Sequence, residues 1–149
     1  MKDIEAAFAG MKWIYALNEE PATLHELEKR IIKVARCSDF ITYSDLVDGV
    51  VFHAKNVKKS PFKIDVHEWE PIDQAIIGDY LGYLSWQSYR KHKLFISALV
   101  VSKQDDTPGE GFYNLMKELG LLSPDTSEER LSIWSKSVSE AHTYYTKER

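Results

Sequence analysis

The sequence contains a single cysteine and no long apolar run. Cys37 alone cannot form a disulfide within the chain, so no disulfide framework is expected. The chain also lacks the ~18 consecutive apolar residues that a membrane-spanning helix requires. Residues 1–5, Met-Lys-Asp-Ile-Glu, lack the basic and apolar regions of a signal peptide. We therefore expect a cytoplasmic protein with no membrane partner.

Cationic side chains are in the minority, with 19 Lys and Arg against 23 Asp and Glu and a net charge of −4. The balance changes along the chain: residues 1–50 carry −3, residues 51–103 carry +3 and residues 104–149 carry −4. A basic middle between acidic ends would attract a polyanion to one face. An ordinary solvated surface is the alternative, and DNA-binding domains are often basic overall.

Hydrophobic residues make up 44% of the 149 residues and aromatic residues 12%, which is enough for one domain with a buried core. Apolar residues recur at helical spacing over residues 4–17 and predict a first helix there. Thr23 with Glu26 forms a capping box that predicts the start of a second helix. We predict that Cys37, at the end of this helix, is a small buried residue.

The middle of the chain predicts two more helices. Thr42 is a suitable N-cap of a short helix, because its hydroxyl can accept a hydrogen bond from a free amide of the first turn. Pro71 suits the first turn of a longer helix that ends in the polar cluster at residues 90–93. Gly78 and Gly82 lie on one face of this helix and predict close packing there.

Strand-like patterns occur at residues 62–69 and, more clearly, at residues 94–101, a nearly continuous apolar run. A turn rich in Asp, Pro and Gly follows at residues 104–111. Gly120 suits the end of the next helix. Thr126 and Glu129 form a capping box for the last one, with a predicted buried stripe of Leu131, Trp134, Val138, Ala141 and Tyr145.

This order of elements predicts a mainly helical α+β fold. We expect residues 1–149 to form a single domain with a winged-helix-like core over about residues 24–122. A small sheet belongs to this core, and N-terminal and C-terminal helices flank it, the last over about residues 127–146. The winged helix is a fold that usually contacts DNA.

The middle of the chain resembles a known family. Residues 42–46 read Thr-Tyr-Ser-Asp-Leu, residues 75–78 read Ala-Ile-Ile-Gly, and an apolar segment at 96–101 is followed by Gly-Glu-Gly-Phe-Tyr at 109–113. These segments are similar to the winged-helix domain of alkylguanine-DNA alkyltransferases and alkyltransferase-like proteins. The resemblance covers roughly half the chain and implies a DNA-binding scaffold.

The reactive group of that family is missing. The family transfers an alkyl group to the cysteine of a Pro-Cys-His-Arg motif, whereas the aligned residues here are Ser97, Ala98 and Leu99. Since a thiolate nucleophile needs sulfur, we predict no catalytic residue and a non-enzymatic, regulatory protein. Gln74 stands near the position of the family's intercalating arginine.

The resemblance implies a nucleic-acid-binding surface. Tyr43 would lie near a phosphate at a helix N-terminus, and Gln74 would contact bases. The predicted phosphate contacts come from six cations: Lys55, Lys58, Lys59, Arg90, Lys91 and Lys93. Asp65, Glu68 and Glu70 offer oxygen ligands for Mg²⁺ but lack the lysine usual in such nucleases, so we predict no metal and no cofactor.

A protein partner is the alternative to DNA. Periodicity does not assign every aromatic residue to the core, and exposed aromatics are favoured as binding anchors. The aromatic residues left over are Trp13, Tyr15, Trp69, Trp86, Tyr89, Tyr144 and Tyr145. The chain would then be a protein-interaction module such as an inhibitor, an immunity protein or an antitoxin-like protein.

Overall fold

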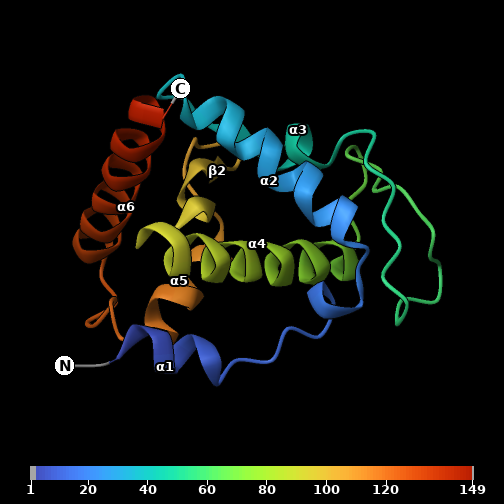
Figure 1. The fold of residues 1–149 in the computed structure, drawn as a ribbon, viewed down its shortest axis with the longest axis horizontal. Coiled ribbons are helices and arrows are strands. Elements are labelled where there is room, and N and C mark those ends of the chain that lie inside the picture. The colour runs from blue at the N-terminus through green and yellow to red at the C-terminus, as the bar shows by residue number, and fades with distance from the viewer. Residues whose placement is uncertain (1–2, 149) are drawn as a thin grey trace.

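The computed structural model describes residues 3–148 and is mainly helical, with one two-stranded parallel sheet (Figure 1). Its elements are α1 (Ile4–Ala9), η1 (Ala16–Asn18), α2 (Pro21–Ala35), β1 (Ile41–Thr42), α3 (Tyr43–Val47), α4 (Pro71–His92), η2 (Ile96–Leu99), β2 (Val100–Val101), α5 (Glu110–Glu118) and α6 (Ser127–Glu148). Ile41 pairs with Val100 and Thr42 with Val101, so the sheet joins the segment before α3 to the segment after α4. Within residues 3–148, no helix combines the length and apolar composition needed to cross a bilayer.

The long helix α4 forms the centre of the fold, with α2, α5 and η2 packed on it (Figure 1). Ile76, Tyr80 and Leu84 are buried on it, as their four-residue spacing predicts. α4 begins at Pro71 as predicted, and a capping box of Glu70 and Asp73 closes its first turn. α6 packs on α2 and η2.

Two predicted helix starts are confirmed. Thr42 caps α3, and its hydroxyl accepts a hydrogen bond from the Asp45 amide at 3.1 Å. Thr126 caps α6 in the same way, and its hydroxyl accepts a hydrogen bond from the Glu129 amide at 3.1 Å. The predicted stripe of α6 is only partly buried, because Leu131 is 59% exposed while Ala141 and Tyr145 are buried.

Three predicted features near the N-terminus are wrong. The first helix ends at Ala9, and residues 10–15 are not helical. α2 begins at Pro21 rather than after Thr23, whose side chain is buried against the 51–53 segment. Cys37 is exposed, since α2 has ended at Ala35 before it.

The predicted strands are also largely wrong. Residues 62–69 form one isolated bridge, between Phe52 and Phe62, and no longer strand. Residues 96–99 form the 3-10 helix η2, and only Val100 and Val101 are in the sheet. The cause is hydrogen bonding from α4: the Ser88 hydroxyl accepts the Ile96 amide at 3.1 Å. The Ser85 hydroxyl accepts the Ser97 amide, also at 3.1 Å. These amides are therefore satisfied without a strand partner.

A buried carboxylate joins three separate segments of the chain. The side chain of Glu19 accepts the hydroxyl of Tyr80, on α4, at 2.5 Å. It also accepts hydrogen bonds from the backbone amides of His53 at 2.8 Å and Glu20 at 2.9 Å. Charge-assisted hydrogen bonds of this kind are the stronger ones, and they satisfy a charge that would otherwise be costly to bury.

Replacing this carboxylate is expected to destabilise the protein. Glu19→Ala leaves the Tyr80 hydroxyl and two amides without an acceptor, and we expect a loss of about 3 kcal/mol of unfolding free energy. Urea denaturation followed by circular dichroism measures it. The control is Glu20→Ala, because Glu20 is exposed and its side chain caps nothing; its effect should stay within about 0.5 kcal/mol. Equal losses in the two variants would contradict this role for Glu19.

Candidate functional site

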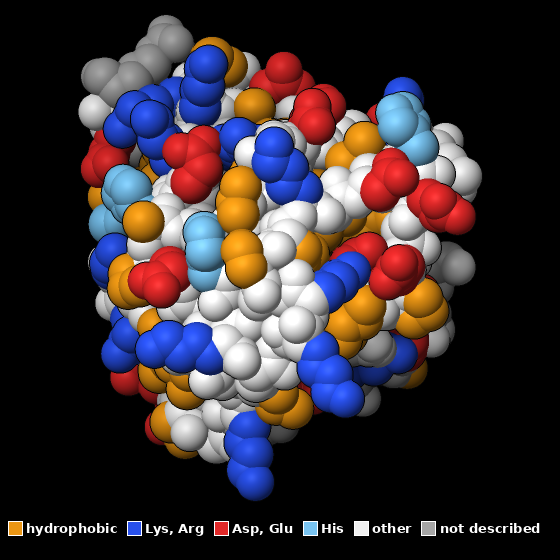
Figure 2. Space-filling model, turned by 90° about the vertical axis from the view of Figure 1, so that its right-hand side faces the viewer, with side chains coloured by type: hydrophobic (Ala, Val, Ile, Leu, Met, Phe, Trp, Pro, Cys, Tyr) orange, Lys and Arg blue, Asp and Glu red, His pale blue; other side chains and the backbone are white. Residues whose placement is uncertain are grey.

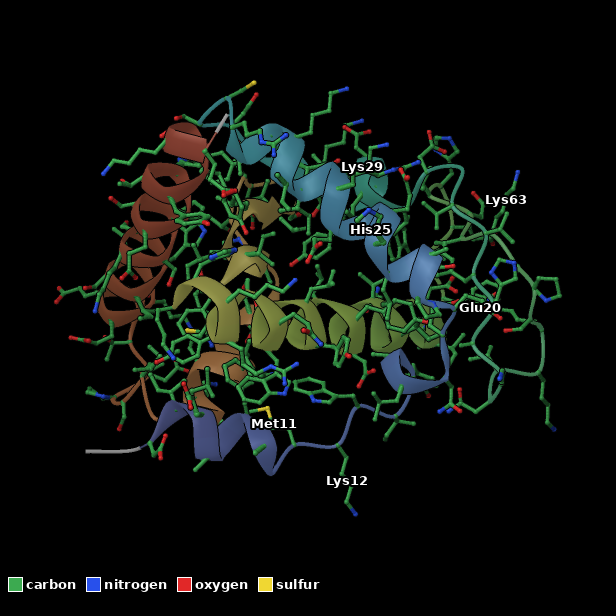
Figure 3. All side chains as sticks on the ribbon, in the orientation of Figure 1. Met11, Lys12, Glu20, His25, Lys29 and Lys63 are labelled. Carbon is green, nitrogen blue, oxygen red and sulfur yellow. The ribbon has the colours of Figure 1, made fainter. Side chains whose placement is uncertain are left out.

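A groove of about 1310 Å³ lies between α4, α5 and the segment that joins α1 to η1. Five of the seven glycines of the chain line it: Gly10, Gly78, Gly82, Gly109 and Gly111. The other lining residues include Trp13, Trp69, Met11, Lys12 and Lys103. Figure 3 shows Met11 and Lys12 on the segment that runs along α4, with the Lys12 side chain extending outward.

The N-terminal wall of the groove is held on α4 by polar and apolar contacts. The Asp79 carboxylate accepts the amides of Tyr15 at 3.0 Å and Ala16 at 2.7 Å. Burial raises the pKa of Asp79, although the donated amide hydrogen bonds act in the opposite direction. The Trp13 ring lies over Gly82, where an added Cβ would be 2.8 Å from the ring carbon Cζ3. These contacts explain why residues 10–15 leave the helical path.

The opposite wall is held by Tyr43. Its hydroxyl accepts the Gly109 amide at 2.8 Å, which joins the start of α3 to the start of α5. Burial raises the pKa of Tyr43, and the hydrogen bond from Gly109 partly offsets that rise. Tyr43 therefore has a structural contact at the place where the resemblance implies a phosphate contact.

The groove brings two of the predicted nucleic-acid-binding residues together. Tyr43 and Gln74 both line it, from the start of α3 and the first turns of α4. Ser97 also lines it, but its hydroxyl accepts a hydrogen bond from Ser85 at 2.7 Å and the residue is only 4% exposed. The remaining predicted residues lie elsewhere.

The six predicted cations do not converge on one surface. Lys59 pairs with Asp73 at 3.0 Å, beside the first turn of α4. Lys58 and Lys59 border a separate hollow of about 310 Å³, and Lys55 lies on the same connection between α3 and α4. Residues 90–93 lie at the other end of α4, about 25 Å away at the helical rise of 1.5 Å per residue.

Several of these cations are already engaged within the protein. Arg90 stacks on the Trp86 ring at 4.7 Å, and Lys93 pairs with Glu5. Lys91 is exposed. Figure 2 shows the face formed around the connection between α3 and α4, where Lys and Arg side chains are interspersed with Asp and Glu rather than gathered into one basic area. Lys63, labelled in Figure 3, points away from the molecule on this connection.

Sequence reasoning missed most of the groove. The sequence predicts close packing at both Gly78 and Gly82, but only Gly82 packs closely, against Trp13. An added Cβ at Gly78 would have no atom within 4 Å, so this glycine faces open space. The signal in the sequence that could have indicated the groove is the uneven spacing of its glycines. Within residues 3–148, no group of three or more His, Cys, Asp or Glu residues is placed to hold a metal ion.

The chain matches no protein-family model, no curated protein and no solved structure in the three comparisons made.

The two helix glycines should respond differently to alanine. Gly78→Ala is expected to stabilise the protein by about 1 kcal/mol, because it adds helix propensity in open space. Gly82→Ala is expected to destabilise it by about 1–3 kcal/mol, because the new methyl group forces the Trp13 ring outward. Urea denaturation and tryptophan emission measure the two effects. If both variants gained stability equally, the contact between Trp13 and Gly82 would not be a packing constraint.

Proposed function

We propose that the chain is a non-enzymatic, nucleic-acid-associated protein with a regulatory role and a winged-helix-like core. The order of elements supports this core: α2 packs on the Thr-capped helix α3, and β2 follows the long helix α4 and pairs beside β1. In this proposal α4 takes the place of the recognition helix. The connection of residues 48–70 between α3 and α4 is longer than in a tight helix-turn-helix.

The groove is the observation that carries the proposal. It places Tyr43 and Gln74 together, and both correspond to positions that contact nucleic acid in the family the chain resembles. Gln74 is exposed on α4 and has an amide that can both donate and accept hydrogen bonds at a base edge. The residues Ser97, Ala98 and Leu99 support a binding role over alkyl transfer, since they include no thiol.

A salt titration tests the proposal. Filter binding with single-stranded and duplex DNA should show retention that falls linearly with the logarithm of salt concentration, because phosphate contacts release counterions. Gln74→Glu should weaken binding severalfold by placing a negative charge at the groove. The control Ser139→Glu adds the same charge on an exposed position of α6, outside the groove, and should leave binding unchanged. Absence of salt-dependent retention for every DNA tested would end the proposal.

A protein-interaction module, such as an inhibitor, immunity or antitoxin-like protein, is the second candidate. Its specific support is a pair of apolar side chains on one turn, Ile14 and Leu17, which are 59% and 67% exposed. Exposed apolar neighbours of this kind mark protein-binding surfaces when they belong to a larger patch. Co-purification of a stoichiometric partner that Ile14→Ser with Leu17→Ser abolishes would favour this candidate. Unchanged co-purification would exclude these two residues as its anchor.

A further inference from the structure

We propose that the groove between α4, α5 and the 10–13 segment binds a single-stranded nucleic acid, with bases against Trp13 and Trp69 and phosphates at Lys12 and Lys103. This inference rests on the proposed function and names the form of nucleic acid and the residues that hold it. Lys12 and Lys103 are not among the cations predicted from the sequence.

Two lysines supply positive charge at the groove. Lys12 and Lys103 are exposed at its edge, and neither side chain has an ion pair, hydrogen bond or aromatic contact within residues 3–148. The three carboxylates that line the groove are engaged: Asp79 by backbone amides, Glu110 by Arg130 at 2.7 Å, and Glu118 by another partner. Lys12 and Lys103 are thus the charged side chains of the lining without a partner within residues 3–148, and an anionic ligand complements them.

Two tryptophans give the groove aromatic surfaces. Trp13 and Trp69 are both partly exposed and both line the groove, Trp13 from the segment after α1 and Trp69 from the connection before α4. Indole rings beside free cations are the combination that binds single strands, because every base can stack on an aromatic face. A duplex keeps its bases stacked on one another and does not offer them to such rings.

The groove is large, and two of its glycines leave open space beside the backbone. The groove volume of about 1310 Å³ exceeds the range of about 300–1,000 Å³ usual for small-molecule pockets. Gly78 and Gly111 leave open space where side chains would otherwise stand, so a ligand backbone can approach α4 and the start of α5 closely. An extended chain fits this shape better than one compact molecule.

A duplex suits this protein less well than a single strand. Duplex binding without base contacts depends on many phosphate contacts, and the cations of this chain are divided between the two ends of α4. The net charge of −4 repels a duplex more than a single strand, because the duplex carries two phosphates per base pair. Stacking in the groove requires fewer cations, so the single strand is the form favoured.

The test uses fluorescence anisotropy with a labelled oligothymidine and with a labelled duplex of the same length. Wild-type protein should bind the single strand more tightly than the duplex. With two lysines in contact, the slope of log K against log salt should be about −1.4 for the single strand. The double variant Lys12→Glu with Lys103→Glu should weaken binding about tenfold or more and flatten this slope. Gly78→Leu should block the groove and weaken binding as strongly.

The matched control is Lys29→Glu with Lys136→Glu, which makes the same change of net charge at exposed lysines of α2 and α6, outside the groove. It should alter binding less than about twofold. Urea denaturation of each variant verifies that it is folded. Trp69→Phe gives a second measurement, because the single strand should quench tryptophan emission less in this variant than in the wild type. The emission of Trp86, which Arg90 and Phe8 cover, should not change when the single strand binds.

The outcomes separate this inference from the proposed function. If the single strand or the duplex binds but the groove variants bind like wild type, the groove assignment is overturned while a nucleic-acid role stands. Equal weakening by the control pair would overturn it too, because binding would then follow overall charge. If neither nucleic acid binds, the proposed function fails. Binding of a polyglutamate peptide in place of the oligonucleotide, with the same dependence on Lys12 and Lys103, would assign the groove to an acidic peptide and overturn the inference.

Discussion

The attachment of residues 13–19 to two neighbouring positions of α4 is the constraint on which the rest of the structure depends. Asp79 accepts the amides of Tyr15 and Ala16, and Tyr80 donates to the buried carboxylate of Glu19. Without these bonds, the polar groups would have to be buried unpaired or return to water. The attachment positions the start of α2 and, through His53, the connection that follows α3. It also forms one wall of the groove.

The parts of the fold that sequence predicts well are those determined by neighbouring residues. Thr42 and Thr126 cap α3 and α6 through amides three residues away, and Pro71 starts α4 because its missing N–H costs nothing at that position. These are local interactions, so the pattern of residues is sufficient. The mainly helical class follows from them.

The parts that sequence misses depend on partners far away in the chain. Residues 94–101 have the composition of a strand, but hydroxyl groups of Ser85 and Ser88 accept their amides and favour a 3-10 turn instead. Residues 4–17 have helical spacing, but Trp13 packs on Gly82, and the Asp79 carboxylate accepts hydrogen bonds from the amides of Tyr15 and Ala16. Tertiary contacts override local propensity in both cases.

Charge shows the same limitation for the site. Residues 51–103 have an excess of basic residues, but this excess does not form a basic surface. Lys59 and Lys93 are paired with carboxylates within the fold, and Arg90 covers a tryptophan ring. The two unpaired lysines at the groove come from segments of opposite net charge: Lys12 from residues 1–50, which carry −3, and Lys103 from residues 51–103, which carry +3. A ligand responds to the charges that remain unpaired in the folded protein, and internal pairing depends on tertiary structure rather than on composition.

Gly78 connects the energetics of the fold with the groove. A glycine in the interior of a helix costs about 1 kcal/mol of stability relative to alanine, and here no neighbouring atom would obstruct a methyl group. Packing within residues 3–148 therefore gives no reason for this glycine, whereas it gives a clear one for Gly82. A ligand whose backbone lies against α4 would supply the missing reason, since only glycine leaves room for such an approach. The free energy of folding lost in the free protein would then be offset by favourable contacts between the ligand and α4 in the complex.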